Sequence, residues 1–146
     1  MKIIRTTESL HPILKNCVHK IQSEIIDSYN FPIRLFETGR LFERHDLLLK
    51  KGKTRDGISR HLFNLDHDPK LYSTAVDYVY FDDKWSWNLR DSTIFSWYML
   101  FGNLVLDKCP ELIWGGFNRK SQNLNHFELK SYVIEKNLDK YPCILS

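Results

Sequence analysis

The sequence has few of the residues that indicate a disulfide framework or a thiolate metal site. Its 146 residues include three cysteines, Cys17, Cys109 and Cys143, which are widely spaced and form no CxxC pair. An odd and scattered set predicts reduced, mostly buried thiols. The chain also lacks a run of lysine and arginine to accompany its net charge of +3, so a nucleic-acid interface is not expected.

Long apolar runs are scarce as well. The most apolar stretch, residues 93–106, is too short and too interrupted to cross a bilayer, so membrane insertion is not expected. Residues 1–5 lack the apolar core of a signal peptide, which predicts synthesis into the cytosol. A hydrophobic content of 42% is sufficient for one folded core.

Helices are predicted from apolar residues at helical spacing and from their end signals. Residues 10–26 form one amphipathic pattern, and residues 41–51 form another that stops at Gly52, a residue typical of helix C-termini. Asp91 or Ser92 can cap a third helix that runs to about Cys109.

Strands are predicted where β-branched and aromatic residues lie between turn residues, at 33–37, 74–81, 112–114 and 126–129. Together the elements predict an α+β domain with a small, mainly antiparallel sheet and packed helices. We expect residues 1–130 to form this domain and residues 131–146 to be a polar tail.

Short motifs follow one another in an order typical of one enzyme family. They are Gly39-Arg40, Glu43-Arg44, Lys51-Gly52-Lys53-Thr54, Ser59-Arg60-His61, Ala75-Val76-Asp77, Lys84-Trp85-Ser86-Trp87, Trp114-Gly115-Gly116 and His126-Phe127-Glu128-Leu129. In this order the chain resembles the phage endolysins of the L-alanyl-D-glutamate peptidase type, in the zinc D,D-peptidase and carboxypeptidase superfamily (peptidase M15). The resemblance covers residues 10–129.

The resemblance implies a zinc site with His61, Asp77 and His126 as ligands. A catalytic zinc commonly has three protein ligands and leaves one position for a water molecule. The resemblance further implies that Arg40 faces the substrate, where a guanidinium can hold a carboxylate or a developing oxyanion. We also expect Ser59 and Glu128 to take part in substrate binding.

The implied function is a peptidase that hydrolyses the L-Ala–D-Glu bond of the peptidoglycan stem peptide through a zinc-activated water. The protein would be a monomer that resides in the host cytoplasm and acts on the periplasmic cell wall after release. A D,D- or L,D-carboxypeptidase on the same scaffold is the alternative among enzymes, because motifs do not encode pocket shape. A structural protein without metal is a further alternative.

Two positions depart from the family pattern. Residues 62–72 form a longer segment between the first two ligands, which brings Asp66 and His67 near the site in sequence, and Ser73 takes the position of a glycine. The family's general base lies three residues before the last zinc histidine, and here that catalytic position is Asn123. An amide can orient a water but cannot accept its proton.

Asn123 leaves several explanations open. The protein can be a weakened or inactive homologue that retains zinc and binds cell-wall peptide or a protein partner, the residue can be an engineered change, or Glu128 can replace the base. Arg40 has a structural alternative too, an ion pair with Glu37 or Glu43. Of the other aromatic and histidine side chains, we expect Trp97 in the core and His11, His19 and His45 on the surface.

Overall fold

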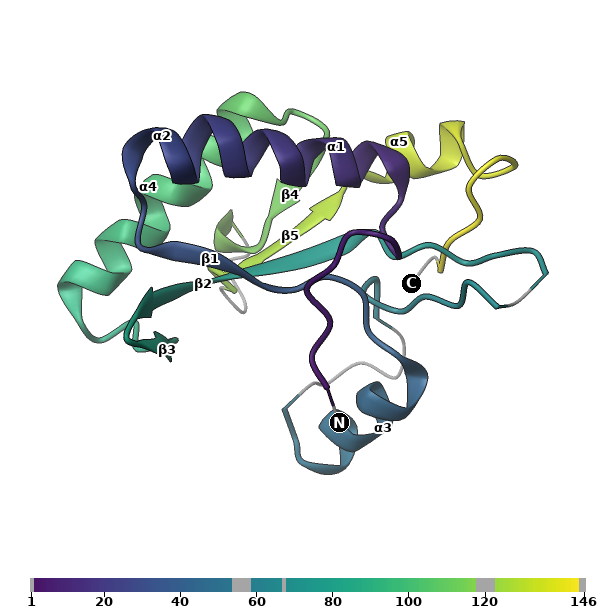
Figure 1. Cartoon of the computed structure of the whole chain (residues 1–146), viewed down its shortest axis with the longest axis horizontal. Coiled ribbons are helices and arrows are strands. Elements are labelled where there is room, and N and C mark those ends of the chain that lie inside the picture. The colour runs from purple at the N-terminus through teal and green to yellow at the C-terminus, as the bar shows by residue number, and fades with distance from the viewer. Residues whose placement is uncertain (1, 54–58, 67, 118–122, 145–146) are drawn as a thin grey trace.

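The computed structural model describes residues 2–53, 59–66, 68–117 and 123–144, as a mixture of helices and strands (Figure 1). The helices are α1 (Pro12–Ile21), continued by a π-helical turn (Gln22–Ile26) and α2 (Asp27–Tyr29), then α3 (Phe42–Lys50), α4 (Ser92–Lys108) and α5 (Ser131–Lys136). The strands are β1 (Ile33–Glu37), β2 (Ala75–Asp82), β3 (Lys84–Ser86), β4 (Leu112–Trp114) and β5 (His126–Leu129). No helix in the described ranges combines the length and the apolar character needed to span a membrane.

The sheet has the strand order β1-β2-β5-β4, and β3 pairs with β2 beside this path. Every one of these pairings is antiparallel. The prediction of an α+β fold with a small antiparallel sheet is therefore confirmed. The sequence analysis did not predict β3, whose three residues follow the tight turn at Asp83, a residue with φ 62°.

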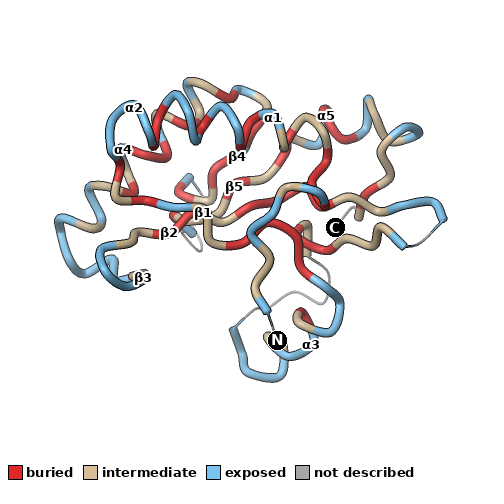
Figure 2. The backbone as a smooth tube through the Cα atoms, viewed as in Figure 1, coloured by how far each residue is buried: buried red, intermediate tan, exposed pale blue. Residues whose placement is uncertain are grey.

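The hydrophobic core lies between one face of the sheet and the helices α1 and α4. Figure 1 shows α1, α2 and α4 on this side, whereas α3 lies on the opposite side. In Figure 2 the buried residues concentrate where these helices meet the sheet. Completely buried side chains of α1, β2, α4 and β5 include Leu14, Ile21, Val76, Phe101, Val105, Phe127 and Leu129. Within the described residues, the opposite face of the sheet, on the side of α3, does not contribute to this core.

Helix ends follow the signals in the sequence. The Asp91 carboxylate accepts hydrogen bonds from the backbone N–H groups of Thr93 and Ile94, at 2.9 and 3.2 Å, and so caps α4. Gly52 has φ 66° and lies after α3, where its N–H donates to the Leu49 carbonyl. Glycine adopts this left-handed conformation at little cost, which explains why α3 ends there.

Two of the three histidines expected on the surface are buried. His11 is fully buried because it caps α1 through a hydrogen bond from the Ile13 N–H to Nδ1 and packs against the ring of Tyr141. His45 is 2% exposed because α3 packs its ring against Arg40. Burial lowers the pKa of His11 below its ordinary value. His19 is exposed as expected.

The C-terminal segment is more than a polar tail. Residues 131–136 form α5, and Val133 and Ile134 belong to the hydrophobic core. Further on, Cys143 is buried and forms a parallel bridge with Tyr72. All three cysteines are free and buried, which confirms that prediction.

The long segment between the first two expected ligands forms an arm. The backbones of Asn64 and Leu71 pair in both directions, at 2.9 and 2.8 Å, so the chain leaves the domain and returns to it. Figure 1 shows this extension beside the C-terminal segment. Asp66 is exposed on the arm, and His67 lies outside the described residues.

Gly102 provides a test of how α4 packs on the sheet. A Cβ atom at this position would lie 2.2 Å from Cε2 of the Trp114 ring, so alanine must displace the indole. We expect Gly102→Ala to lower the free energy of unfolding by about 1–3 kcal/mol. The measurement is urea denaturation, with Asn103→Ala, an exposed position of the same helix, as the matched control. A Gly102→Ala protein as stable as the control would contradict this packing.

Candidate metal centre

The site begins with a row of residues on the open face of the sheet. Glu37 in β1 pairs with Asp77 in β2, and Asp77 pairs with His126 in β5. Directly opposed residues of antiparallel strands have side chains on the same face. The strand register therefore brings together a glutamate, an aspartate and a histidine that are up to 89 positions apart in the sequence.

His61 joins this row from a loop that is fixed on both sides. The His61 carbonyl accepts a hydrogen bond from the Arg40 N–H at 2.7 Å, and the Arg60 carbonyl accepts one from the Thr74 N–H at 2.8 Å. These bonds attach the loop to the residues after β1 and before β2. The His61 ring is 2% exposed as a result.

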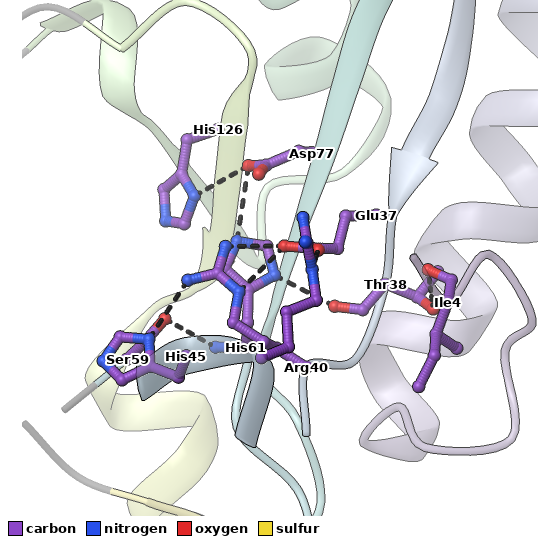
Figure 3. A network of polar contacts seen from close by, with 10 residues as sticks. Ile4, Glu37, Thr38, Arg40, His45, Ser59, His61, Asp77 and His126 are labelled. Atoms are coloured by element: carbon purple, nitrogen blue, oxygen red, sulfur yellow. Dashed lines mark hydrogen bonds and ion pairs between the residues drawn. The ribbon is translucent and has the colours of Figure 1, made fainter. Parts of the chain in front are cut away.

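Asp77 lies between the two imidazoles. Its Oδ1 atom is 3.0 Å from Nδ1 of His126 and 3.4 Å from Nε2 of His61 (Figure 3). One potential ligand atom from each of the three residues lies within 4.8 Å of the other two. Two imidazoles and one carboxylate are the donor set of several catalytic zinc sites, so the residues present fit this metal.

The Thr38 carbonyl orients the His61 ring. It lies 2.9 Å from Nδ1 of His61, and because a carbonyl can only accept, this nitrogen carries the proton. Nε2 faces Asp77 and is the nitrogen that a metal can bind when the ring is neutral. Thr38 is itself held, since its N–H donates to the Ile4 carbonyl at 2.8 Å and its hydroxyl to the Thr6 carbonyl at 2.6 Å. Such outer hydrogen bonds fix the tautomer of a metal-binding histidine.

The three groups influence one another's protonation strongly. Burial alone raises the pKa of Asp77, but the charge of His61 and hydrogen bonds from His126 and His61 outweigh it and hold this pKa well below its ordinary range. Burial lowers the pKa of His126, but the hydrogen bond to Asp77 and attraction to Glu128 raise it to about 9. A proton in the metal-free site is thus stabilised where a cation would bind.

Arg40 forms the structural ion pair considered for it in the sequence analysis and also lines the cleft. It is 7% exposed and donates from Nε to Glu37 Oε1 at 2.9 Å, which makes the structural ion pair. Arg44 donates from its Nε to the other oxygen, Oε2, at 2.6 Å. Both guanidiniums also line the cleft beside the candidate ligands. One buried carboxylate between two guanidiniums leaves this wall of the cleft positively charged.

Ser59 and Glu128 line the same cleft. The Ser59 hydroxyl accepts a hydrogen bond from the His61 N–H at 3.2 Å, so it shapes the turn that carries the ligand. Glu128 lies 3.3 Å from Nε of Arg60 and 3.8 Å from Nε2 of His126. Burial raises the pKa of Glu128, but attraction to His126 and Arg60 lowers it below the ordinary value.

Asn123 lies on the exposed rim of this cleft. Its N–H donates to the Gly115 carbonyl at 3.2 Å, and its own carbonyl accepts from the His126 N–H at 3.1 Å. A Cβ atom on Gly115 would lie 2.4 Å from the Asn123 carbonyl oxygen, so only glycine permits this approach. The backbone of Asn123, the position that the resemblance gives to a general base, is thereby attached to the candidate ligand His126.

The cleft has a volume of about 1140 Å³. Its lining includes every site residue that the sequence analysis named, which are Arg40, Ser59, His61, Asp77, Asn123, His126 and Glu128. It also includes Glu37, Arg44 and Arg60, which that analysis did not place in the site. Only the strand register could have identified Glu37, because it is the cross-strand neighbour of Asp77.

A second group of potential ligands lies in the core. Sulfur atoms of Cys17 and Cys109 and a carboxylate oxygen of Glu111 lie within 4.8 Å of one another. The Cys17 thiol donates to Glu111 at 3.4 Å. Structural zinc sites almost always have four ligands, and this group has three members among the residues that the structure describes. The donors present satisfy one another without an ion.

Comparison with solved structures relates the fold to that of an L-Ala D-Glu endopeptidase. One similar structure is the L-Ala D-Glu endopeptidase ChiX of Serratia marcescens, which aligns with a TM-score of 0.60 over 90% of this chain and 94% of that chain, at 20% identity. At this identity the likeness shows a shared fold. No protein-family model matches the sequence. No curated protein matches it either.

Loss of one imidazole tests the metal centre directly. We expect His61→Ala to abolish stoichiometric zinc binding, because two remaining donors cannot hold the ion against solvent and chelators. The measurement is zinc content by atomic emission after dialysis against a weak chelator. His19→Ala, which removes an exposed imidazole from α1, is the matched control and should retain the metal. Equal zinc content in both variants would contradict the assignment.

The raised pKa of His126 gives a second test. In the metal-free protein we expect its imidazole to titrate near 9, and Asp77→Asn to bring the pKa down toward the ordinary value of about 6.5. The measurement is an NMR pH titration of the histidine Cε1–H signals. Because only the neutral imidazole binds zinc, the apparent zinc affinity should fall as the pH is lowered from 9. A pH-independent affinity between 6 and 9 would disagree with this linkage.

Proposed function

We propose that this protein is a zinc-dependent peptidase that hydrolyses the stem peptide of bacterial peptidoglycan at the L-Ala–D-Glu bond. The observation that carries the proposal is the convergence of His61, Asp77 and His126 at the bottom of an open, positively charged cleft. The shared fold with an L-Ala D-Glu endopeptidase supports the choice of substrate.

Zinc held by these three residues would lower the pKa of a water molecule toward about 7 and polarise the scissile carbonyl. Other residues of the protein orient the ligands and provide positive charge around them. Thr38 keeps His61 in the tautomer that presents Nε2. Arg40 and Arg44, held in place by Glu37, provide positive charge for the carboxylates of the peptide or for an oxyanion.

Proton transfer is the step for which the site is poorly equipped. Asn123 can hold a water by hydrogen bonding, but its amide does not accept a proton near neutral pH. Glu128 is a weak substitute, because its ion pair with Arg60 and its proximity to His126 lower its pKa. We therefore propose that the protein with Asn123 hydrolyses the stem peptide slowly. A zinc-binding homologue that holds wall peptide without cleaving it is the second candidate, and Asn123 is the observation that favours it.

The biological setting that we propose follows from the resemblance to phage endolysins. The protein acts as a monomer, accumulates in the host cytoplasm, and reaches the wall when it is released into the periplasm. A D,D- or L,D-carboxypeptidase would share the site but release a free terminal amino acid. Mass spectrometry of the products separates these activities, because an L-Ala–D-Glu endopeptidase releases a peptide that begins with D-Glu.

Restoring a carboxylate at the rim tests both the function and the role of Asn123. We expect Asn123→Asp to increase kcat on purified muropeptides by about 10²- to 10⁴-fold, the usual contribution of a general base. The assay follows release of the D-Glu peptide from zinc-loaded proteins. Asn125→Asp, which adds the same charge to another residue that lines the cleft, is the matched control. If zinc-loaded wild-type and Asn123→Asp proteins both bind the muropeptide but neither cleaves it, the binding-protein alternative is correct.

A further inference from the structure

One wall of the cleft is aromatic and solvent-exposed. Trp87 follows β3, is 48% exposed, and lines the cleft together with Phe36. A large apolar side chain with this exposure that borders the candidate metal ligands is a feature that the proposed hydrolysis does not require. Together with Phe36 it gives the cleft an aromatic surface that an apolar face of a ligand can contact.

The indole of Trp87 is held by a packed row of rings. Its centroid lies 5.0 Å from that of Phe36 at an interplanar angle of 88°, an edge-to-face contact. Phe36 makes a similar contact with Trp85 at 5.0 Å and 73°. The Arg5 guanidinium lies over both Phe36 and Trp85, at 5.1 and 5.0 Å from their centroids. The row fixes the orientation of Trp87 before any ligand binds.

An irregularity in the sheet brings this row to the cleft. The register of β1 and β2 shifts between Leu35 and Glu37, so Phe36 is the extra residue of a bulge. Bulges redirect side chains and occur often beside active sites. Because of this bulge, Phe36 and Glu37 both line the cleft although they are consecutive in β1.

The two walls of the cleft differ in chemistry. The wall formed by α3 and the residues around it carries Arg40, Arg44 and Lys51, whereas the wall near β3 carries Phe36 and Trp87. Figure 1 shows β3 and α3 well apart on the open side of the sheet. A ligand that spans the cleft would therefore be anionic at one end and have an apolar face at the other.

We propose that Phe36 and Trp87 form a subsite for the N-acetylmuramic acid residue to which the stem peptide is attached. This inference rests on the proposed function. In peptidoglycan the L-Ala residue is linked to the lactyl group of this sugar, so the ring lies one residue from the L-Ala–D-Glu bond. D-Glu and the diamino acid after it carry carboxylates on the other side of the bond, where the cleft is basic.

The cleft has room for a sugar as well as a peptide. Its volume of about 1140 Å³ lies slightly above the ~300–1,000 Å³ typical of small-molecule sites. A pyranose ring presents a face of C–H groups that stacks on an indole, and Trp87 offers this surface with its ring already oriented. The sugar is thus recognised by the aromatic wall, and the acidic peptide by the basic wall.

The test compares two substrates in which the L-Ala nitrogen is part of an amide and which differ in the sugar. These are N-lactyl-L-Ala-D-Glu-diaminopimelate and the same tripeptide attached to the lactyl group of N-acetylmuramic acid. We expect zinc-loaded wild-type protein to prefer the sugar-bearing substrate by about tenfold in kcat/KM, similar to one aromatic stacking contact in other ligands. Trp87→Ala should reduce the ratio of the two kcat/KM values to about one, and Trp87→Phe should retain part of it.

Leu89→Ala is the matched control, because Leu89 is an exposed apolar residue close to Trp87 in sequence that does not line the cleft. It should keep the wild-type ratio. A wild-type ratio of one, or a Trp87→Ala protein with the wild-type ratio, would overturn the subsite. A purely structural role for Trp87 would lower both kcat/KM values and leave their ratio unchanged.

Failure of the proposed function has a different signature. If neither substrate is cleaved, the same two compounds are titrated calorimetrically into zinc-loaded wild-type and Trp87→Ala proteins. Tighter binding of the sugar-bearing compound that is lost in Trp87→Ala supports the subsite in a protein without peptidase activity. Equal binding of both compounds by the wild type rejects the subsite.

Discussion

The antiparallel register of β1, β2 and β5 is the constraint on which the site depends. It aligns Glu37, Asp77 and His126 in one row across three strands. Because side chains alternate along a strand, a slip of one residue would turn Asp77 into the core and bring Tyr78 to the cleft. The buried face of β2, with Val76 and Tyr78 packed under α1 and α4, fixes the register and so keeps the carboxylate between the two imidazoles.

The same row contains two groups of opposite charges, one around Glu37 and one around Asp77. Glu37 neutralises part of the charge of two guanidiniums, and its cross-strand neighbour Asp77 stabilises two imidazoles. Removing either carboxylate would leave uncompensated positive charge at a buried site, which is strongly unfavourable. The positive potential of the cleft and the candidate cation site can coexist because a separate carboxylate serves each of them.

Much of this arrangement could be predicted from the sequence, because its signals are local. The strand at 33–37, the glycine that ends α3 and the Asp91 cap each depend on a few neighbouring residues, and each prediction was confirmed. The resemblance named His61, Asp77 and His126, which the structure brings together. Burial of His11 and His45 and the position of Glu37 depend on contacts with distant residues, such as Tyr141 and Asp77, that periodicity does not reveal. The helix at 131–136 was missed because its few buried residues give a weak pattern.

The backbone just before β2 is held by both ends of the chain. The Tyr72 N–H donates to the Pro142 carbonyl and the Ser73 N–H to the Ser9 carbonyl, each at 2.8 Å, and the next residue, Thr74, donates to the loop that carries His61. Truncations that remove Ser9 or Pro142 would therefore take away hydrogen bonds to the residues just before β2. The geometry of the candidate metal centre would loosen first, while the hydrophobic core stayed intact.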